Sequence, residues 1–173
     1  MKLYSEICGY VPGDPSTDQG CQLVDVMNYW KTTGAPDGNH KIAAWVAVDA
    51  TNPEEYKTAM WLFESLYIGL DLPDAYISPF PSSQGFVWDV AGDPDPQNGH
   101  CICGIGYQSN GVNIATWGLD GLLTDAAIAK YVSTSVGGEM YTILSQDSIN
   151  KAKQTVRSGF NFSQLLADIE SIG

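Results

Sequence analysis

Basic side chains are scarce in this sequence of 173 residues. Lysine and arginine together number 8, against 20 aspartates and glutamates, so the formal net charge at pH 7 is −12. A protein that binds the phosphate backbone of nucleic acids needs a basic face, and attraction to anionic lipids also depends on clustered Lys and Arg. The charge balance therefore argues against nucleic acid and membrane surfaces as partners.

Long apolar runs are also missing. No stretch reaches the ~18 residues that a membrane-spanning helix needs. The first residues, Met1 to Glu6, lack the apolar segment of a secretory signal, so we expect no export. A hydrophobic content of 44% is ordinary for a globular protein, and the length fits one domain.

Cysteine is too rare for a disulfide-rich scaffold. The four cysteines are Cys8, Cys21, Cys101 and Cys103, and their spacings lack the CxxC pattern that is typical of zinc sites. We expect most of these thiols to be small buried side chains, with Cys101 and Cys103 in the core. The sequence predicts no metal site and no cofactor.

Apolar periodicity and turn formers predict the order of the elements. We expect helices over about 2–8, 21–32, 52–66, 125–135 and 161–172, strands over 41–48, 67–72, 99–108, 112–117 and 139–144, and a long ordered loop over 73–99. Asn52-Pro53 is typical of a helix start, and Asn110-Gly111 indicates a tight hairpin. Because helices come first and hairpin-connected strands follow, we predict an α+β fold.

The most informative segment is the predicted hairpin that begins at residue 99. Gly99-His100 opens its first strand, which runs into Gly106-Tyr107, and the second strand ends in Trp117-Gly118. This arrangement resembles the papain-like cysteine peptidases, including a group of bacterial and bacteriophage papain-like proteins. In that family the first strand begins with the catalytic histidine, and the second ends in Asn-Ser-Trp-Gly. The resemblance implies that His100 is the catalytic base and that Trp117 shields the pair that orients it.

An earlier segment extends this resemblance. Asp18-Gln19-Gly20, followed by a helix, is similar to the family's Asn-Gly-Gly stretch, whose backbone pairs with the substrate. The resemblance therefore implies substrate-binding roles for Gln19, Gly20 and Trp117. It covers most of the chain, about residues 5–145.

The resemblance also implies an architecture. We expect a papain-like fold, in which helices pack on a mostly antiparallel sheet or half-barrel. The papain-like domain would cover residues 1–145, without the family's first helix, and a C-terminal helical extension would cover residues 146–173.

Two departures from the family concern its catalytic residues. Ala115 stands at the asparagine position and cannot accept a hydrogen bond from the imidazole, so Asn113, on the same strand face, or a loop residue such as Asp89 would have to replace it. The family's nucleophilic cysteine lies on a helix that precedes the segment beginning here at residue 5. We therefore expect that helix to be absent, and with it the helix N-terminus that lowers the pKa of the thiol.

Cys21 is the alternative nucleophile. It follows Gln19-Gly20 and begins a predicted helix, which is the local setting of a reactive thiol. The alignment with the family instead places Cys21 at the wall of the substrate groove.

Three hypotheses follow. The first, which we favour, is a papain-like protein that no longer performs proteolysis and acts as a binding or structural module, such as a bacteriophage virion or host-interaction component. It would bind a protein or peptide or self-associate, and it would be cytoplasmic or virion-associated. The second is an active thiol hydrolase that uses Cys21 and His100, or a nucleophile from another chain. The third is that the chain is a fragment of a longer protein.

Overall fold

The computed structural model describes residues 2–35, 40–145, 147, 149, 150, 161, 163–165, 167 and 168. The chain divides into two compact units. Unit 1 consists of Met1–Trp45 and Leu144–Gly173, and unit 2 consists of Val46–Ile143. None of the helices in this described part is long and apolar enough to span a membrane.

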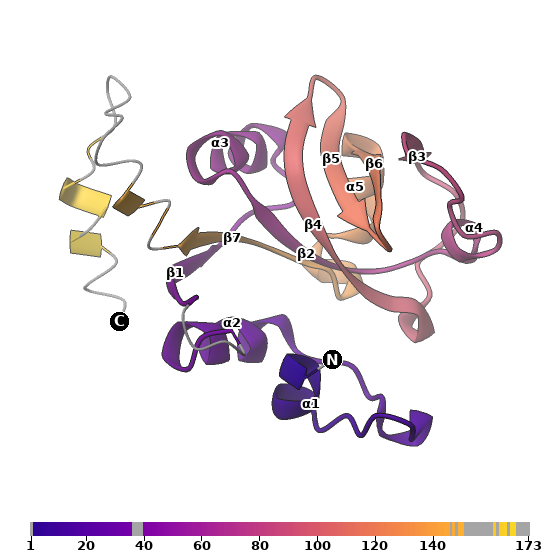
Figure 1. Ribbon diagram of the computed structural model, residues 1–173. Coiled ribbons are helices and arrows are strands. Elements are labelled where there is room, and N and C mark those ends of the chain that lie inside the picture. The colour runs from indigo at the N-terminus through magenta and orange to yellow at the C-terminus, as the bar shows by residue number, and fades with distance from the viewer. Residues whose placement is uncertain are drawn as a thin grey trace. The chain divides into compact units, whose positions relative to one another are not determined.

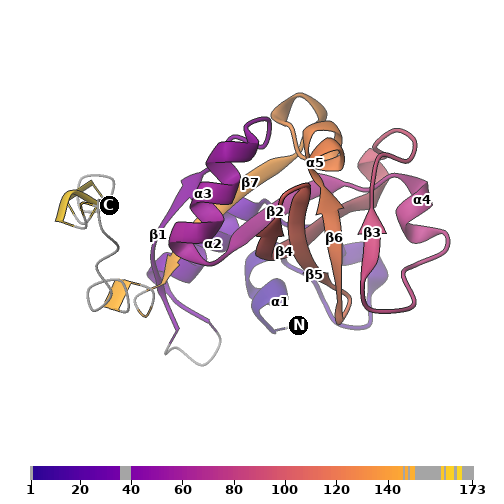
Figure 2. The same ribbon diagram turned by 90° about the horizontal axis from the view of Figure 1, so that it is seen from above.

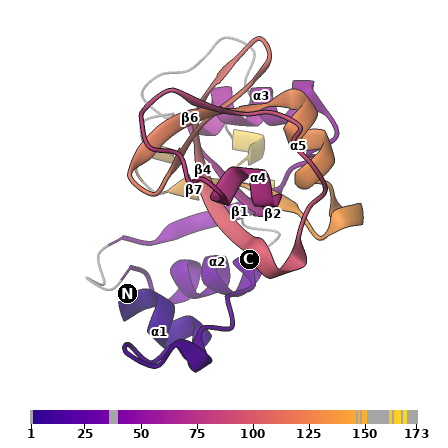
Figure 3. The same cartoon turned by 90° about the vertical axis from the view of Figure 1, so that its right-hand side faces the viewer.

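Unit 1 contains two helices and the start of a strand. These are α1 (Lys2–Cys8), α2 (Leu23–Thr32) and the first residues of β1 (Ile42–Ala47), with a short 3₁₀ turn over Pro15–Thr17 between the helices. Figure 3 shows α1 and α2 next to each other. The buried apolar side chains of this unit include Leu23 and Met27 on α2, whereas α1 has no buried residue.

A disulfide joins Cys8 to Cys21, so these two are not among the free buried thiols that we expected most of the four cysteines to be. The turn-rich segment between them returns the chain from the end of α1 to the residue that precedes the N-cap of α2. The two Cα atoms are then 5.3 Å apart, which is within the usual range for a disulfide.

Unit 2 consists of a β-sheet and the helices that connect some of its strands. Its elements, with the two strands that the unit boundary divides, are β1 (Ile42–Ala47), α3 (Pro53–Phe63), β2 (Leu66–Asp71), α4 (Asp74–Ile77), β3 (Phe86–Trp88), β4 (Gly99–Gln108), β5 (Gly111–Thr116), β6 (Leu119–Thr124), α5 (Asp125–Tyr131) and β7 (Glu139–Ser145). Short 3₁₀ turns lie at Pro96–Asn98 and Thr134–Val136. Figure 1 shows their arrangement.

The strand order is β1-β7-β2-β4-β5-β6-β3. The pairings of β2 with β4 and β7, of β4 with β5 and of β5 with β6 are antiparallel, and β3 pairs with β6 in parallel. The predicted α+β class with a mostly antiparallel sheet is therefore confirmed. β3 and β6 were not predicted, and the expected loop over 73–99 contains α4 and β3.

The core of unit 2 lies between one face of the sheet and the helices α3 and α5, which Figure 2 shows on that face. Ile68, Ile102 and Ile114 come from three neighbouring strands and are almost completely buried. Strand side chains alternate between faces, so the even-numbered residues of β2 and the first half of β4 face this core.

Local signals account for the helix starts. Asn52 Oδ1 accepts a hydrogen bond from the Glu55 amide, with Pro53 in the first helical turn. Thr124 Oγ1 accepts from the Ala127 amide at the start of α5. The helix predicted over 161–172 and the extension over 146–173 lie largely outside the described residues.

Candidate functional site

His100 lies at the start of β4, where the topology brings it beside the end of β5. It pairs with Leu70 of β2 in register, and its side chain is half-buried on the helix-covered face of the sheet. His100 Nε2 lies 2.7 Å from Oγ1 of Thr116, the last residue of β5. Because this threonine is buried, its hydroxyl holds the imidazole in one orientation.

Trp117 covers the imidazole from the turn that follows β5. The φ angles of Trp117 and Gly118 are +50° and +77°, which is the pattern of a two-residue type I′ hairpin turn between β5 and β6. The Trp117 ring lies over the His100 ring, with 4.6 Å between centroids and 26° between planes. A left-handed backbone costs a residue with a side chain roughly 1–2 kcal/mol, and these ring contacts help to hold Trp117 there.

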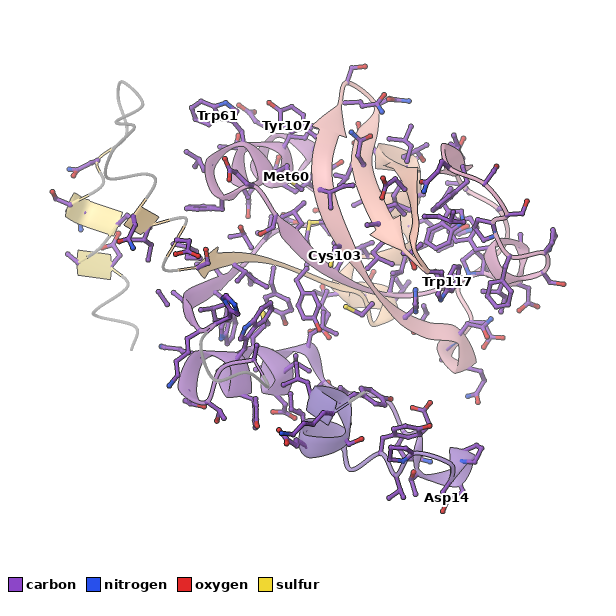
Figure 4. The ribbon with its side chains drawn as sticks, in the orientation of Figure 1. Asp14, Met60, Trp61, Cys103, Tyr107 and Trp117 are labelled. Atoms are coloured by element: carbon purple, nitrogen blue, oxygen red, sulfur yellow. A yellow bond between two sulfur atoms is a disulfide. The ribbon has the colours of Figure 1, made fainter. Side chains whose placement is uncertain are left out.

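Other aromatic rings surround Trp117. Phe80 and Trp88 each meet it nearly edge to face, with centroid distances of 4.8 Å and 5.8 Å. Trp88 is buried and stacks on Tyr76 of α4, whereas Phe80 and Trp117 are 60% and 44% exposed. Figure 4 shows Trp117 at the end of β5, on the side of unit 2 where α4 lies.

Burial sets the charge of the histidine. It lowers the pKa of His100, because the protonated ring loses hydration. The imidazole is therefore mainly neutral at pH 7, and one ring nitrogen carries the proton. Nδ1 has no hydrogen-bond partner in the part of the chain that the structure describes.

The residue that orients His100 is Thr116, and neither Asn113 nor Asp89 has that role. Asn113 Oδ1 instead accepts from Gln108 Nε2 at 2.7 Å. Asp89 accepts from the Thr124 hydroxyl and from the amide of the next residue.

A β-bulge explains why this partner was missed. Next to the hairpin turn, Tyr107 pairs with Val112 and Gly106 with Asn113. If this register continued along both strands without a bulge, residues 113 and 115 would lie on the same face as His100. The register shifts between Gly104 and Gly106, so Gly104 pairs with Ile114. This one-residue shift moves Thr116 to the histidine's face and Ala115 to the opposite face.

The remaining predicted site residues lie in unit 1. Cys21 is bonded to Cys8, and in that form it has no thiol to ionise. Gln19 donates through Nε2 to the Ser16 carbonyl at 2.9 Å, and Gly20 is exposed with φ of +74°. His100, Asn113 and Trp117, the other three predicted residues, belong to unit 2.

The two free thiols were expected in the core, and this expectation is wrong. Cys103 is exposed and Cys101 partly buried. Both lie on the face of β4 opposite His100, because they are the odd-numbered residues before the bulge. Desolvation raises the pKa of both thiols, that of Cys101 to about 12. They are therefore protonated at pH 7.

Within the described residues, no cluster of three His, Cys, Asp or Glu side chains has the arrangement of a metal site. Comparison of the chain with protein-family models and with curated proteins gave no match.

Proposed function

We propose that this chain is a papain-like protein that does not carry out proteolysis and acts as a binding or structural module for a protein or peptide. One observation carries the proposal: in the described residues, an oriented histidine has no reactive thiol to activate. Cys21 is in a disulfide, and the thiols next to His100 in sequence lie on the other sheet face. A role in a bacteriophage virion or in host interaction belongs to this proposal through the family resemblance alone.

Thiol catalysis has a geometric requirement that supports this choice. The nucleophile and its base must lie within hydrogen-bond reach, about 2.6–3.2 Å. The strand backbone directs the Cys101 side chain away from the imidazole. Its pKa of about 12 also leaves too little thiolate for attack at pH 7.

The groups that remain around His100 are suited to contact rather than to chemistry. Phe80 and Trp117 present exposed aromatic rings, and their partners Trp88 and Tyr76 are buried beneath them. Exposed, well-supported aromatic side chains are common in the centres of protein interfaces.

A second candidate is a thiol hydrolase whose nucleophile comes from another chain. The observation that favours it is the state of His100: Thr116 engages Nε2, Trp117 covers the ring, and Nδ1 has no partner in the described part of the chain. In the tautomer in which Nε2–H donates a hydrogen bond to Thr116 Oγ1, Nδ1 carries a lone pair and can act as a general base.

Labelling with iodoacetamide, mapped by mass spectrometry, tests the binding module against a hydrolase that uses Cys21 of this chain as its nucleophile. For the binding module we expect slow labelling at Cys103, the exposed thiol, at the same rate in the wild type and in His100→Ala. The experiment is run before and after mild reduction, with Cys21→Ala as the matched variant. Rapid labelling of Cys21 that disappears in His100→Ala would overturn the proposal and favour a hydrolase.

A further inference from the structure

The aromatic pair, defined as Phe80 and Trp117, is a rigid exposed surface. The two rings meet at 82° with 4.8 Å between centroids, and they are 60% and 44% exposed. His100 stacks on one face of Trp117, and the buried Trp88 meets Trp117 nearly edge to face. Because packing fixes Trp117, a partner that binds there loses little side-chain entropy on the protein's side.

The negative charge of unit 2 favours a positively charged partner. Residues 46–143 contain 12 acidic side chains and two lysines, so their formal net charge is −10. Both lysines are in ion pairs, Lys57 with Asp125 at 2.7 Å and Lys130 with Asp93 at 3.1 Å. His100 adds little positive charge, since burial lowers its pKa. The unit therefore attracts cations and repels acidic segments.

Part of this negative charge lies on the side of the aromatic pair. Asp74 begins α4, the helix whose Tyr76 stacks on Trp88, and it is exposed. Its Oδ1 accepts from Asn98 Nδ2 at 3.0 Å, two residues before His100. A pocket of about 550 Å³ opens beside it, with further carboxylates among the residues that line it.

We propose that the aromatic pair docks a basic peptide segment of a partner protein. An arginine or lysine of that segment packs on the exposed parts of the Trp117 and Phe80 rings, and a second basic side chain pairs with Asp74. The attraction combines cation–π contact, the stacking preference of the planar guanidinium and the field of the acidic unit. This inference rests on the proposed binding function and names its partner's chemistry.

Selection from a randomised seven-residue peptide library displayed on beads tests the proposal. The immobilised probe is the intact protein at 150 mM salt, and the bound peptides are sequenced. We expect Lys and Arg to be enriched and Asp and Glu to be depleted relative to the unselected library. The most frequent peptide, made with a fluorescent label, is then titrated by anisotropy.

Variants then locate the site. Trp117→Ala and Phe80→Ala should each weaken binding by roughly 2–5-fold, the range for cation–π contacts at exposed sites. Asp74→Asn should weaken binding about 2-fold and reduce its salt dependence. Glu54→Gln, which removes the same charge from the exposed start of α3, is the matched control and should leave affinity almost unchanged. Circular dichroism melts confirm that each variant is folded.

The outcomes are distinct. Selected peptides without an excess of Lys and Arg, or equal affinity for Trp117→Ala and the wild type, would overturn the basic-segment inference while leaving a binding function in place. A library that yields no bound peptide overturns the inference as well. In either case the iodoacetamide experiment decides separately whether the non-catalytic function stands.

Discussion

Replacing Thr116 with valine removes the group that orients His100 and changes little else. Valine has nearly the shape of threonine, so the buried end of β5 keeps its packing. The lost group is the hydroxyl oxygen, which lies 2.7 Å from His100 Nε2. The variant therefore isolates one hydrogen bond and its effect on the imidazole.

The size of the effect depends on how far water can replace the lost partner. A hydrogen bond contributes about 0.5–1.5 kcal/mol net, and a fully buried unpaired group costs about 1–3 kcal/mol. His100 is half-buried, so water reaches its ring in part, and we expect a loss of about 1–2 kcal/mol in the free energy of unfolding. For a chain of this size, each 1 kcal/mol lowers Tm by roughly 2–4 °C.

Urea unfolding followed by tryptophan fluorescence measures the loss, and nitrogen NMR of the histidine rings reports which ring nitrogen carries the proton. Thr116→Ser keeps the hydroxyl and should retain the wild-type tautomer of His100. In Thr116→Val the two tautomers should become more equally populated. If valine leaves both the stability and the tautomer unchanged, Thr116 does not orient His100.

Two further predictions concern titration and the disulfide. Burial lowers the pKa of His100, so the unfolded state binds more protons than the folded state between that lowered value and ~6.5, and the free energy of unfolding should fall as the pH drops through this window. His100→Gln should flatten the slope of the free energy of unfolding against pH. A slope that is the same in His100→Gln and in the wild type would contradict this reasoning. Cys8 and Cys21 are 13 residues apart, and closing a loop of that size stabilises a fold by about 3 kcal/mol, so reduction should make the segment between them a site of rapid limited proteolysis. The control variant Cys103→Ser should be cleaved at the same rate as the wild type. Equal protection from the protease with and without reductant would refute a constraining role of the disulfide.

Local sequence signals were sufficient for the class and most elements of this fold. The predicted strand over 99–108 has the bounds of β4, and α2, α3 and α5 begin within two residues of their expected starts. Helix caps, prolines and hairpin dipeptides depend on only three or four consecutive residues, so they can be recognised in the sequence without the tertiary structure. The resemblance to the papain-like family singled out His100 and Trp117, which the structure brings into contact.

The partners of these residues were decided only by the tertiary structure. The bulge between Gly104 and Gly106 changes which side chains of β5 share a face with His100, and thereby selects Thr116. The pairing of Cys8 with Cys21 likewise depends on how the chain returns from α1 to α2. Sequence alone determined the α+β class and the position of the histidine, because those follow from local patterns; register and cysteine pairing needed the structure, because a one-residue shift or a loop's path is set by packing across the fold.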